Sequence, residues 1–366
     1  MKQDRKSQYY QKKIEPKGIQ PGMTAAELID HCFTSFNARG LRNACQLYSQ
    51  RILQENTTVG VSLAGALVPA GLGESCLIPL IKAGYIDWMI STGANLYHDL
   101  HKCLGYTMYE GSFNVDDTRL REDDVVRIHD IYFESDALFD TDLFIRELFR
   151  QKKIENPISS AELHRIIGEV LLERWSDSHN YSVLAAAAQM DVPIHTSSPG
   201  DSSTGMNLAA LALEGYSLHI DPNLDVNLTA AWVYDAKKSG GKSAALILGG
   251  GSPKNFLLQT EPQIQEVLGL QEAGHDFFIQ FTDARIDTGG LSGATPSEAV
   301  SWGKIDPTQL SSTMVVYGDC SVYLPLLTAY VINSGVQVQP RRLWQRREEC
   351  YDRLVEAYKK SKHFGK

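Results

Sequence analysis

Six short apolar segments recur along this chain of 366 residues, and stretches with helical character separate them. Short strands that are apolar throughout are typical of a sheet buried on both faces, and helices are the usual connections between parallel strands. The sequence therefore predicts an α/β fold, a single large domain with a mostly parallel sheet flanked by helices. We expect the strands at residues 58–63, 86–91, 192–195, 242–248, 277–281 and 314–317.

The first helix has a recognisable start, because Thr24 is followed three residues later by Glu27. This spacing is that of a capping box, and it predicts a helix over residues 25–36. Upstream of this helix the chain is polar and carries prolines and glycines, whereas its other end is rich in lysine. We expect an N-terminal arm at 1–22, the main domain at 23–335, and a basic C-terminal helix or tail at 336–366.

The overall charge and the cysteines exclude several classes of protein. A formal net charge of −9 argues against nucleic-acid binding and is compatible with a cationic small-molecule substrate. The six cysteines lie far apart and form no C-x-x-C pair, which indicates buried thiols and neither a disulfide framework nor a metal site. The charged N-terminus lacks a signal-peptide pattern, and the apolar runs are too short to span a membrane. We expect a cytoplasmic protein without a membrane partner.

Five of the expected strands end in small, polar or glycine residues, where ligands bind in parallel sheets. After residues 242–248 the chain continues with Gly249, Gly250 and Gly251, which allow a phosphate to approach the backbone. Together these loops predict a nucleotide bound across several strand ends. Asp201 and Asp319 would suit ribose hydroxyls, although each is equally well explained as a helix cap or turn residue.

Lys304 is the candidate nucleophile of the chain. It follows a glycine-rich loop and stands between Trp302 and Ile305 in the segment GGLSGATPSEAVSWGKI. A lysine that does covalent chemistry must lose its proton, and apolar or aromatic surroundings lower its pKa. The alternative is a surface lysine whose stem packs on Trp302. The glycine-rich strand end LILGGGSPK elsewhere in the chain favours the covalent role.

Four motifs resemble the deoxyhypusine synthase family over residues 36–332: SGATPSEAVSWGKI, LILGGGSPK, DLHKCL and VYGDCSVYLPLL. The resemblance implies a Rossmann-like fold as in deoxyhypusine synthase, with NAD as cofactor. In that family NAD oxidises spermidine to an imine, and a lysine takes the butylamine part as an enzyme-bound imine. An acceptor amine then captures this group. The resemblance also implies a homotetramer made of dimers, with sites at the dimer interface.

The resemblance assigns roles to individual residues. Lys304 matches the nucleophile, Trp302 its aromatic neighbour, and Glu298 a carboxylate that holds a substrate ammonium. An indole face and a carboxylate both attract a cation. The positions expected to bind the cofactor are Thr92, Gly93, Asp201, Gly250, Gly251, Asp283, Ala284, Asp319 and Cys320.

The sequence departs from the family pattern inside the expected substrate site. Asn255 stands where the family has a histidine that acts as a base, and Met206 and Leu291 replace two aspartates that help to bind the polyamine. Ala66 and Pro69 replace an asparagine and a serine of the first nucleotide loop. Fewer anionic contacts reduce affinity for a trication. We therefore expect a smaller or less cationic amine with a free amine as acceptor, as in homospermidine formation from putrescine units.

His98 replaces a glutamate of the family, and it lies three residues before His101. On a helix the two rings would share a face and could bind a metal, but no third ligand is evident, which favours a structural pair. We expect no metal and regard His98 as a candidate general base in place of the missing histidine. The charge-dense run at 119–130 is expected to be solvated or to face another subunit, without a catalytic role.

Three classes of function remain open from the sequence. The first is the aminoalkyl transferase, which needs Lys304. The second is an NAD-dependent amine dehydrogenase that has lost the acceptor step and has no need of this lysine. The third is an NAD-binding protein without turnover. Trapping with borohydride distinguishes the first from the second, because only the transferase forms an imine with a lysine.

Overall fold

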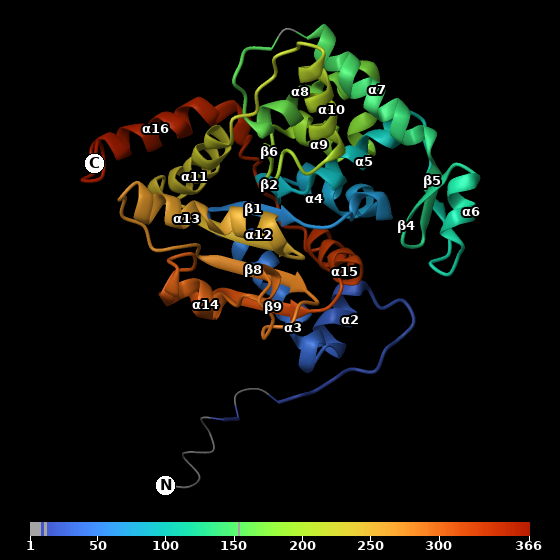
Figure 1. The fold of residues 1–366 in the computed structure, drawn as a ribbon. Helices are drawn as coiled ribbons and strands as arrows, with labels where there is room; N and C mark the ends of the chain where they lie inside the picture. Colours follow the sequence, from blue (N-terminus) through green and yellow to red (C-terminus); the bar gives the residue numbers. More distant parts are fainter. Residues whose placement is uncertain (1–8, 11–12, 153) are drawn as a thin grey trace, which may run out of the picture.

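A computed structural model describes residues 9–10, 13–152 and 154–366 of the chain. Its centre is a six-stranded parallel sheet in the order β6-β2-β1-β7-β8-β9, with helices on both faces (Figure 1). The predicted α/β class and the parallel sheet are thereby confirmed. The strands are β1 (Thr57–Leu63), β2 (Trp88–Ser91), β6 (Ile194–Thr196), β7 (Lys242–Leu248), β8 (Phe277–Thr282) and β9 (Thr313–Tyr317).

The strand order places the end of β1 beside the end of β7. From β1 the chain winds outward through β2 to β6, then returns to the other side of β1 for β7, β8 and β9. This is the order of a Rossmann sheet, and the reversal between β1 and β7 marks the crevice where ligands bind. Leu63 pairs with both Ser91 and Leu248, so the carboxyl ends of these three strands lie level.

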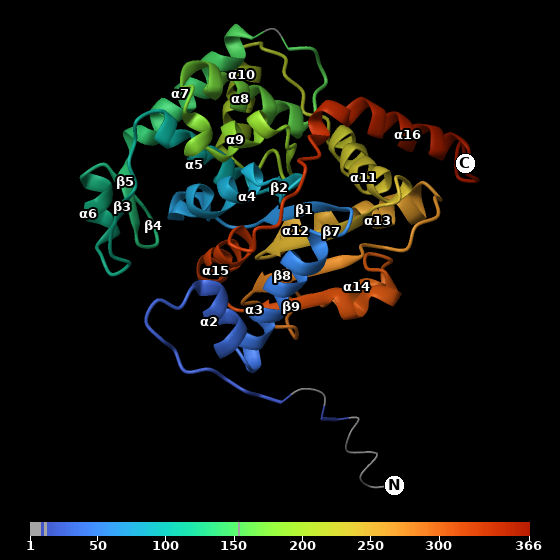
Figure 2. The same cartoon turned by 180° about the vertical axis from the view of Figure 1, so that it is seen from behind.

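Each face of the sheet has its own hydrophobic core, because alternate residues of a strand point to opposite sides. In β7, Leu246 and Leu248 join the core beneath α3 and α15, whereas Ala245 and Ile247 join the core beneath α11 and α12. Figures 1 and 2 show these two helical layers from opposite sides. The helices are α2 (Ala25–Cys32), α3 (Phe36–Leu47), α4 (Ile78–Lys82), α5 (Gly93–Cys103), α6 (Asp117–Glu122), α7 (Asp136–Gln151), α8 (Ser160–Arg174), α9 (Val183–Met190), α10 (Ser203–Leu213), α11 (Pro222–Lys238), α12 (Gly251–Leu258), α13 (Thr260–Pro262), α14 (Pro296–Ser301), α15 (Cys320–Ile332) and α16 (Arg347–Lys359).

The first helix begins as expected but is shorter than the predicted range 25–36. Both hydrogen bonds of the capping box between Thr24 and Glu27 are present. The helix ends at Cys32, whose carbonyl accepts a hydrogen bond from the backbone of Thr34, and a second helix begins at Phe36. Threonine and serine at positions 34 and 35 favour such turns, because their side chains compete with helical hydrogen bonding.

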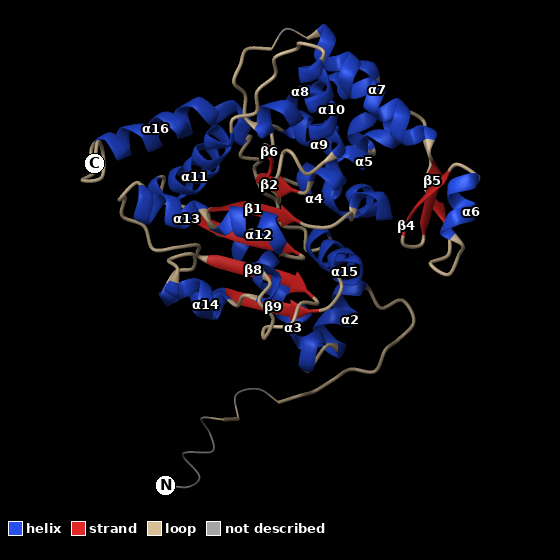
Figure 3. Cartoon of the chain, viewed as in Figure 1, coloured by secondary structure: helices blue, strands red, loops and turns tan. Residues whose placement is uncertain are grey.

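A second, smaller sheet lies outside the main one and was not predicted. It joins β3 (Tyr109–Glu110), β4 (Val125–Ile128) and β5 (Ile131–Glu134) in the antiparallel order β3-β5-β4 (Figure 3). The charge-dense run at 119–130 supplies part of α6 and all of β4, and neither element contains a buried residue. The absence of buried residues in these two elements agrees with the expectation that the run is solvated. The strand β4 was not predicted, because the many charged residues of the run hide its alternating pattern.

The C-terminal segment is an integral part of the second core. Cys350 and Leu354 of α16 are buried against α11, and Leu343 is buried just before this helix. Arg346 and Arg353 both form ion pairs with Asp235 of α11, at 2.9 and 2.6 Å. Residues 336–366, for which a basic helix or tail was expected, therefore contain the packed helix α16.

The N-terminal arm is described only in part. Residues 1–8 and 11–12 of the predicted arm at 1–22 lie outside the described residues, and 13–22 are exposed. All six cysteines are free thiols, and five of them are buried. Among the described residues, no helix combines the length and the apolar character needed to cross a bilayer.

Candidate active site

The glycine turn that follows β7 lies against the loop that leads to α14. Gly249 and Gly251 have φ angles of +86° and +62°, which L-residues with a Cβ rarely adopt. Between them, a Cβ on Gly250 would lie 2.4 Å from the Ser292 hydroxyl oxygen. The backbone N–H of Gly251 donates to the same hydroxyl at 2.9 Å. This close approach explains why glycines are needed, and it joins the turn to the segment that carries Lys304.

The end of β2 joins two further loops at the same edge of the sheet. The Thr92 hydroxyl donates to the carbonyl of Gly65 at 2.7 Å, and the Asn95 amide donates to it at 3.1 Å. Gly93 packs so closely on Ser202 that an added Cβ would come within 2.1 Å of the serine Cβ. The loops after β1, β2 and β6 therefore meet beside the point where the strand order reverses.

The predicted aspartates after β8 and β9 are both exposed, but only Asp319 has a structural role. Asp283 is exposed, and the backbone N–H of Ala284 donates to the Thr282 hydroxyl at 3.1 Å. Asp319 accepts a hydrogen bond from the backbone of Ser321 at 2.6 Å, so it caps α15 as the alternative interpretation stated.

Two of the other predicted cofactor residues have contrasting environments. The Cys320 thiol is buried and donates to the carbonyl of Phe281, and burial raises its pKa to about 11. Only the backbone of Cys320 is therefore suited to meet a ligand. Asp201, in the loop after β6, is exposed.

Lys304 lines a pocket of about 300 Å³ next to the glycine turn. Its Nζ atom lies 3.0 Å from Oδ1 of Asn255 and 5.7 Å from the centre of the Trp302 ring. The pocket wall is otherwise mostly apolar, and Glu298 is its one carboxylate. The lining residues are Lys254, Asn255, Leu258, Gln259, Phe278, Leu291, Ala294, Thr295, Glu298, Ala299, Trp302 and Lys304.

Local structure determines how Lys304 enters this pocket. Thr295 caps α14 by accepting a hydrogen bond from the backbone of Glu298 at 3.2 Å. After this short helix, Gly303 turns the chain with a φ of +65°, and Lys304 donates its N–H to the carbonyl of Ala299 at 3.0 Å. The next residue, Ile305, is fully buried in the core. The side chain of Lys304 is therefore held on a short loop that is fixed at both ends.

The surroundings of Lys304 favour its neutral form. Partial burial lowers the pKa of its ammonium, and the negative charges of Glu298 and Glu266 oppose this shift. The net result is a pKa below that of an exposed lysine. A neutral amine that faces a pocket is a nucleophile, which is the chemistry that the sequence predicted for this residue.

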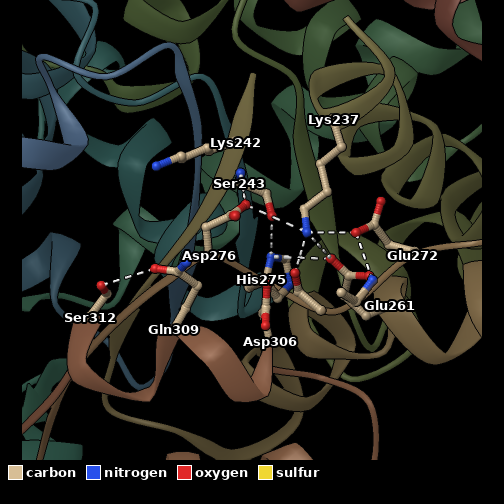
Figure 4. Close-up of polar contacts among 12 residues, drawn as sticks. Lys237, Lys242, Ser243, Glu261, Glu272, His275, Asp276, Asp306, Gln309 and Ser312 are labelled. Carbon is tan, nitrogen blue, oxygen red and sulfur yellow. Dashed lines mark hydrogen bonds and ion pairs between the residues drawn. The ribbon is translucent and has the colours of Figure 1, made fainter. Parts of the chain in front are cut away.

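A polar cluster around Lys237, Glu261 and His275, drawn in Figure 4, is hydrogen-bonded to the segment that carries Lys304. The backbone N–H of His275 donates to the carbonyl of Lys304 at 3.0 Å, and the His275 ring contacts the Ser243 hydroxyl at 3.0 Å. Gln265 donates both to the carbonyl of Gly303 at 2.7 Å and to Glu261 at 3.2 Å. The loop that carries Lys304 is thus tied to the interior of the protein.

Lys237 is the cation at the centre of this cluster, and it lies within 4 Å of three carboxylates. These are Glu272 at 2.7 Å, Asp276 at 3.5 Å and Glu261 at 3.7 Å. Burial raises the pKa of Glu261 to about 8, so this carboxyl group is neutral at pH 7. The ammonium of Lys237 then faces two negative carboxylates, those of Glu272 and Asp276. The third acid, Glu261, is protonated and neutral.

Comparison with known proteins shows the family to which the chain belongs. The model of the family described as deoxyhypusine synthase matches residues 28–331. The chain belongs to the deoxyhypusine synthase family. It is 54% identical to the deoxyhypusine synthase-like protein of Nostoc punctiforme over 94% of this chain and 89% of that one. It is also 36% identical to the "Probable deoxyhypusine synthase 2" of Methanosarcina acetivorans, over 83% of this chain and 85% of that one.

A solved structure supports the fold at much lower sequence identity. The crystal structure of a "putative deoxyhypusine synthase" from Entamoeba histolytica has a TM-score of 0.59 and 15% identity. It covers 88% of this chain and 98% of its own chain. The family is one of aminobutyl-type transferases, and this chain is a deoxyhypusine synthase-like transferase.

Lys254 is a pocket residue that the sequence analysis did not assign. It is only 3% exposed, and its ammonium donates to Oε1 of Gln280, to the carbonyl of Ser292 and to the carbonyl of Ala294. Burial lowers its pKa to about 8. The motif LILGGGSPK contains this lysine, but nothing in a linear motif indicates that its side chain would be buried.

His98 lines a different pocket of the same chain from the one that Lys304 lines. This second pocket measures about 330 Å³ and is lined by His98 together with Glu74, Lys102 and other residues, but not by Lys304. The Nδ1 atom of His98 lies 2.9 Å from Nε2 of His101, whose Nδ1 lies 2.7 Å from the Thr141 hydroxyl. Burial lowers the pKa of His98 to about 4 and that of His101 to about 3, so both rings are neutral at pH 7.

Leu291 and Met206, the two apolar residues expected at aspartate positions of the family, lie in different places. Leu291 lines the Lys304 pocket and is 49% exposed, whereas Met206 on α10 is 61% exposed and does not line it. The described residues contain no group of three or more His, Cys, Asp or Glu side chains that could hold a metal ion. Within one chain, the structure therefore brings together Lys304, Asn255, Trp302, Glu298 and Leu291, but neither His98 nor Met206.

Proposed function

We propose that this protein is an NAD-dependent aminoalkyl transferase in which Lys304 carries the transferred group as an imine. The observation that carries the proposal is the position of Lys304. Its Nζ atom lies 3.0 Å from Asn255 and faces Trp302, in a pocket adjoining the glycine turn. A lysine with a lowered pKa beside an aromatic wall suits covalent amine chemistry.

The glycine turn and the neighbouring strand ends fit a dinucleotide. Gly249, Gly250 and Gly251 form a turn without side chains at the start of α12, beside the reversal between β1 and β7, so a phosphate can approach the backbone closely. Thr92, Gly93, Asp201, Asp283, Ala284 and Asp319 belong to loops of the same sheet edge. When bound there, NAD would accept a hydride from the donor amine and return it to the product.

The residues of this chain would perform the transfer between these two redox events. Neutral Lys304 adds to the C=N carbon of the oxidised donor and expels the leaving amine, which takes up a proton. The carbon chain is then linked to Lys304 as an imine. An acceptor amine adds to the same carbon, and Lys304 leaves again as an amine. The apolar wall excludes water that would hydrolyse the linkage.

The charges of the pocket support a small donor. Glu298 is the one carboxylate of the lining, and the pocket also contains Lys304 and the ammonium of Lys254. Within one chain a trication would meet a single carboxylate, whereas a diamine can place one ammonium between Glu298 and Trp302. We therefore propose a diamine or a similarly small amine as donor, with a free amine as acceptor.

A second copy of the chain is part of the proposal. Met206, Leu291 and Trp302 are 61%, 49% and 59% exposed, which is unusual for large apolar side chains near a site. Together with the separate linings of the His98 and Lys304 pockets, this supports a homo-oligomer, a tetramer built of dimers, whose sites are completed between subunits.

The deciding experiment is intact-mass measurement after incubation with NAD, a panel of di- and triamines, and borohydride. We expect a mass gain that requires NAD and is absent in Lys304→Ala. The size of the gain identifies the transferred fragment. NADH formation without a mass gain would indicate an amine dehydrogenase instead, and NAD binding without either change would indicate a protein without turnover.

A further inference from the structure

Lys254 is only 3% exposed, and its three N–H groups are all used in hydrogen bonds to the protein. They donate to Oε1 of Gln280 at 3.0 Å, to the carbonyl of Ser292 at 3.3 Å and to the carbonyl of Ala294 at 2.7 Å. An ammonium has three donors, so this side chain has none left for a substrate. The ammonium of Lys254 therefore binds other parts of the protein and not a substrate.

The partners of Lys254 belong to the two segments that form the candidate active site. Gln280 of β8 accepts from Lys254 and also donates to the carbonyls of Gly249 and Ser292, at 2.9 Å each. The Ser292 hydroxyl in turn accepts from the N–H of Gly251. Lys254, Gln280 and Ser292 thus form one connected hub between the glycine turn and the loop at 291–295.

We propose that Lys254 is a positioning residue whose buried ammonium couples the glycine turn after β7 to the placement and charge state of Lys304. The inference rests on the proposed roles of the glycine turn and Lys304. The loop at 291–295 leads directly into α14 and hence to Lys304, so its attachment to the hub determines where the nucleophile lies. Lys254 also lines the same pocket as Lys304, and its ammonium adds a positive charge there at neutral pH.

Two physical effects of this hub act in the same direction. Below about pH 8, where Lys254 carries its charge, a neighbouring ammonium disfavours the protonated form of Lys304. A loop that is held in place also keeps water from Lys304 and maintains its partial burial. Loss of the hub would therefore make Lys304 protonated over a wider pH range, and it would loosen the backbone of the glycine turn.

Competitive acetylation tests this inference without any substrate. The full-length protein is treated with trace acetic anhydride between pH 6 and 10, and mass spectrometry quantifies the Lys304 peptide. In Lys254→Met we expect the midpoint of Lys304 acetylation to rise by about one pH unit. Gln280→Leu keeps the ammonium and its two carbonyl partners, and we expect a smaller rise in the same direction. If Lys254→Met fails to fold, Gln280→Leu still tests the inference.

Lys242→Met is the matched control, because Lys242 also lies over an aromatic ring, that of Phe277, but at the opposite end of β7. It should leave the Lys304 midpoint unchanged. An unchanged midpoint in both hub variants, with native circular dichroism, would overturn the inference. NAD titration adds a second readout, a lower affinity in the hub variants, because the glycine turn loses its attachment. If wild-type protein binds no NAD, the proposed function fails, whereas the acetylation result still decides the role of Lys254.

Discussion

The Nζ atom of Lys304 and the Oδ1 atom of Asn255 lie 3.0 Å apart, and they come from segments separated by 49 residues. The resemblance to the family places Asn255 where a histidine is expected, but an amide cannot take up a proton at neutral pH. It can accept a hydrogen bond from Lys304 and so fix the direction of the nucleophile. Any proton transfer in this site must therefore use another group.

Replacement of Asn255 tests this orienting role. Asn255→Ala should slow imine formation about 10- to 100-fold, because a hydrogen bond to a charged or reactive nitrogen contributes about 1.5–3 kcal/mol. The rate is measured by quenching with borohydride at timed intervals. Asn333→Ala removes an asparagine whose amide donates only to the carbonyl of Ala329, and it should have no effect. Equal rates for the two variants would exclude the orienting role.

Trp302 should contribute to amine binding more than to chemistry. Trp302→Leu removes the ring face while keeping an apolar side chain, and we expect the half-saturating diamine concentration to rise about 2- to 10-fold. The partial exposure of the ring keeps this effect modest. Trp344→Leu, in a separate surface pocket, serves as a matched control for loss of a tryptophan. A change in maximal rate alone would contradict a binding role.

The pH dependence of trapping follows from the charges around Lys304. Because its pKa is lowered, the neutral amine is already present below the pH range of an ordinary lysine, and the trapping rate should increase with pH until Lys304 is deprotonated. Glu298 raises the pKa of Lys304. Glu298→Gln should therefore move the midpoint to lower pH while weakening diamine binding. A midpoint that moves to higher pH would contradict this assignment.

His98 and Lys304 can be tested for action across a subunit interface. His98→Ala alone should keep NAD binding but lose turnover. If the two residues serve one site from different chains, unfolding and refolding a mixture of His98→Ala and Lys304→Ala should restore about a quarter of wild-type activity. His129→Ala, which changes an exposed histidine, should be active by itself. No recovery in hybrids that assemble normally would confine both residues to the same chain or remove His98 from the mechanism.

The buried acid cluster predicts a pH-dependent stability. Burial raises the pKa of Glu261 from 4.5 to about 8, with Lys237 opposing and Glu272 and Asp276 supporting the shift. The folded state therefore binds this proton more tightly than the unfolded state. Its contribution to stability is complete below pH 4.5 and is lost, at about 1.4 kcal/mol per pH unit, as the pH rises toward 8.

Thermal denaturation measures this effect. The melting temperature of the wild-type protein should fall between pH 6 and 9. In Glu261→Gln the curve should be flatter, because the amide resembles the protonated acid and retains a partner for Gln265. Glu356→Gln, on the exposed side of α16, should follow the wild-type curve. Identical slopes for wild type and Glu261→Gln would show that Glu261 is not neutral in the folded protein.

Much of the fold and the centre of the candidate site could be predicted from the sequence. The six strands, the capping box at Thr24 and the glycines after β7 are encoded by spacing within a few residues. Trp302, Glu298 and Lys304 lie in one such segment, so their common pocket follows from a short helix and one glycine turn. Local periodicity and turn chemistry carry this information directly.

Other features depended on contacts between distant segments. Lys254 is buried because β8 and the loop at 291–295 close around it, and Cys350 is buried because α16 packs on α11. His98 lies in a pocket apart from Lys304, although the motifs alone suggested one site. Sequence by itself determined the elements and the reactive segment, because their signals act over a few residues. Only the tertiary structure decided which side chains lost contact with water and which met, because burial and charge coupling arise when segments far apart in the chain pack together.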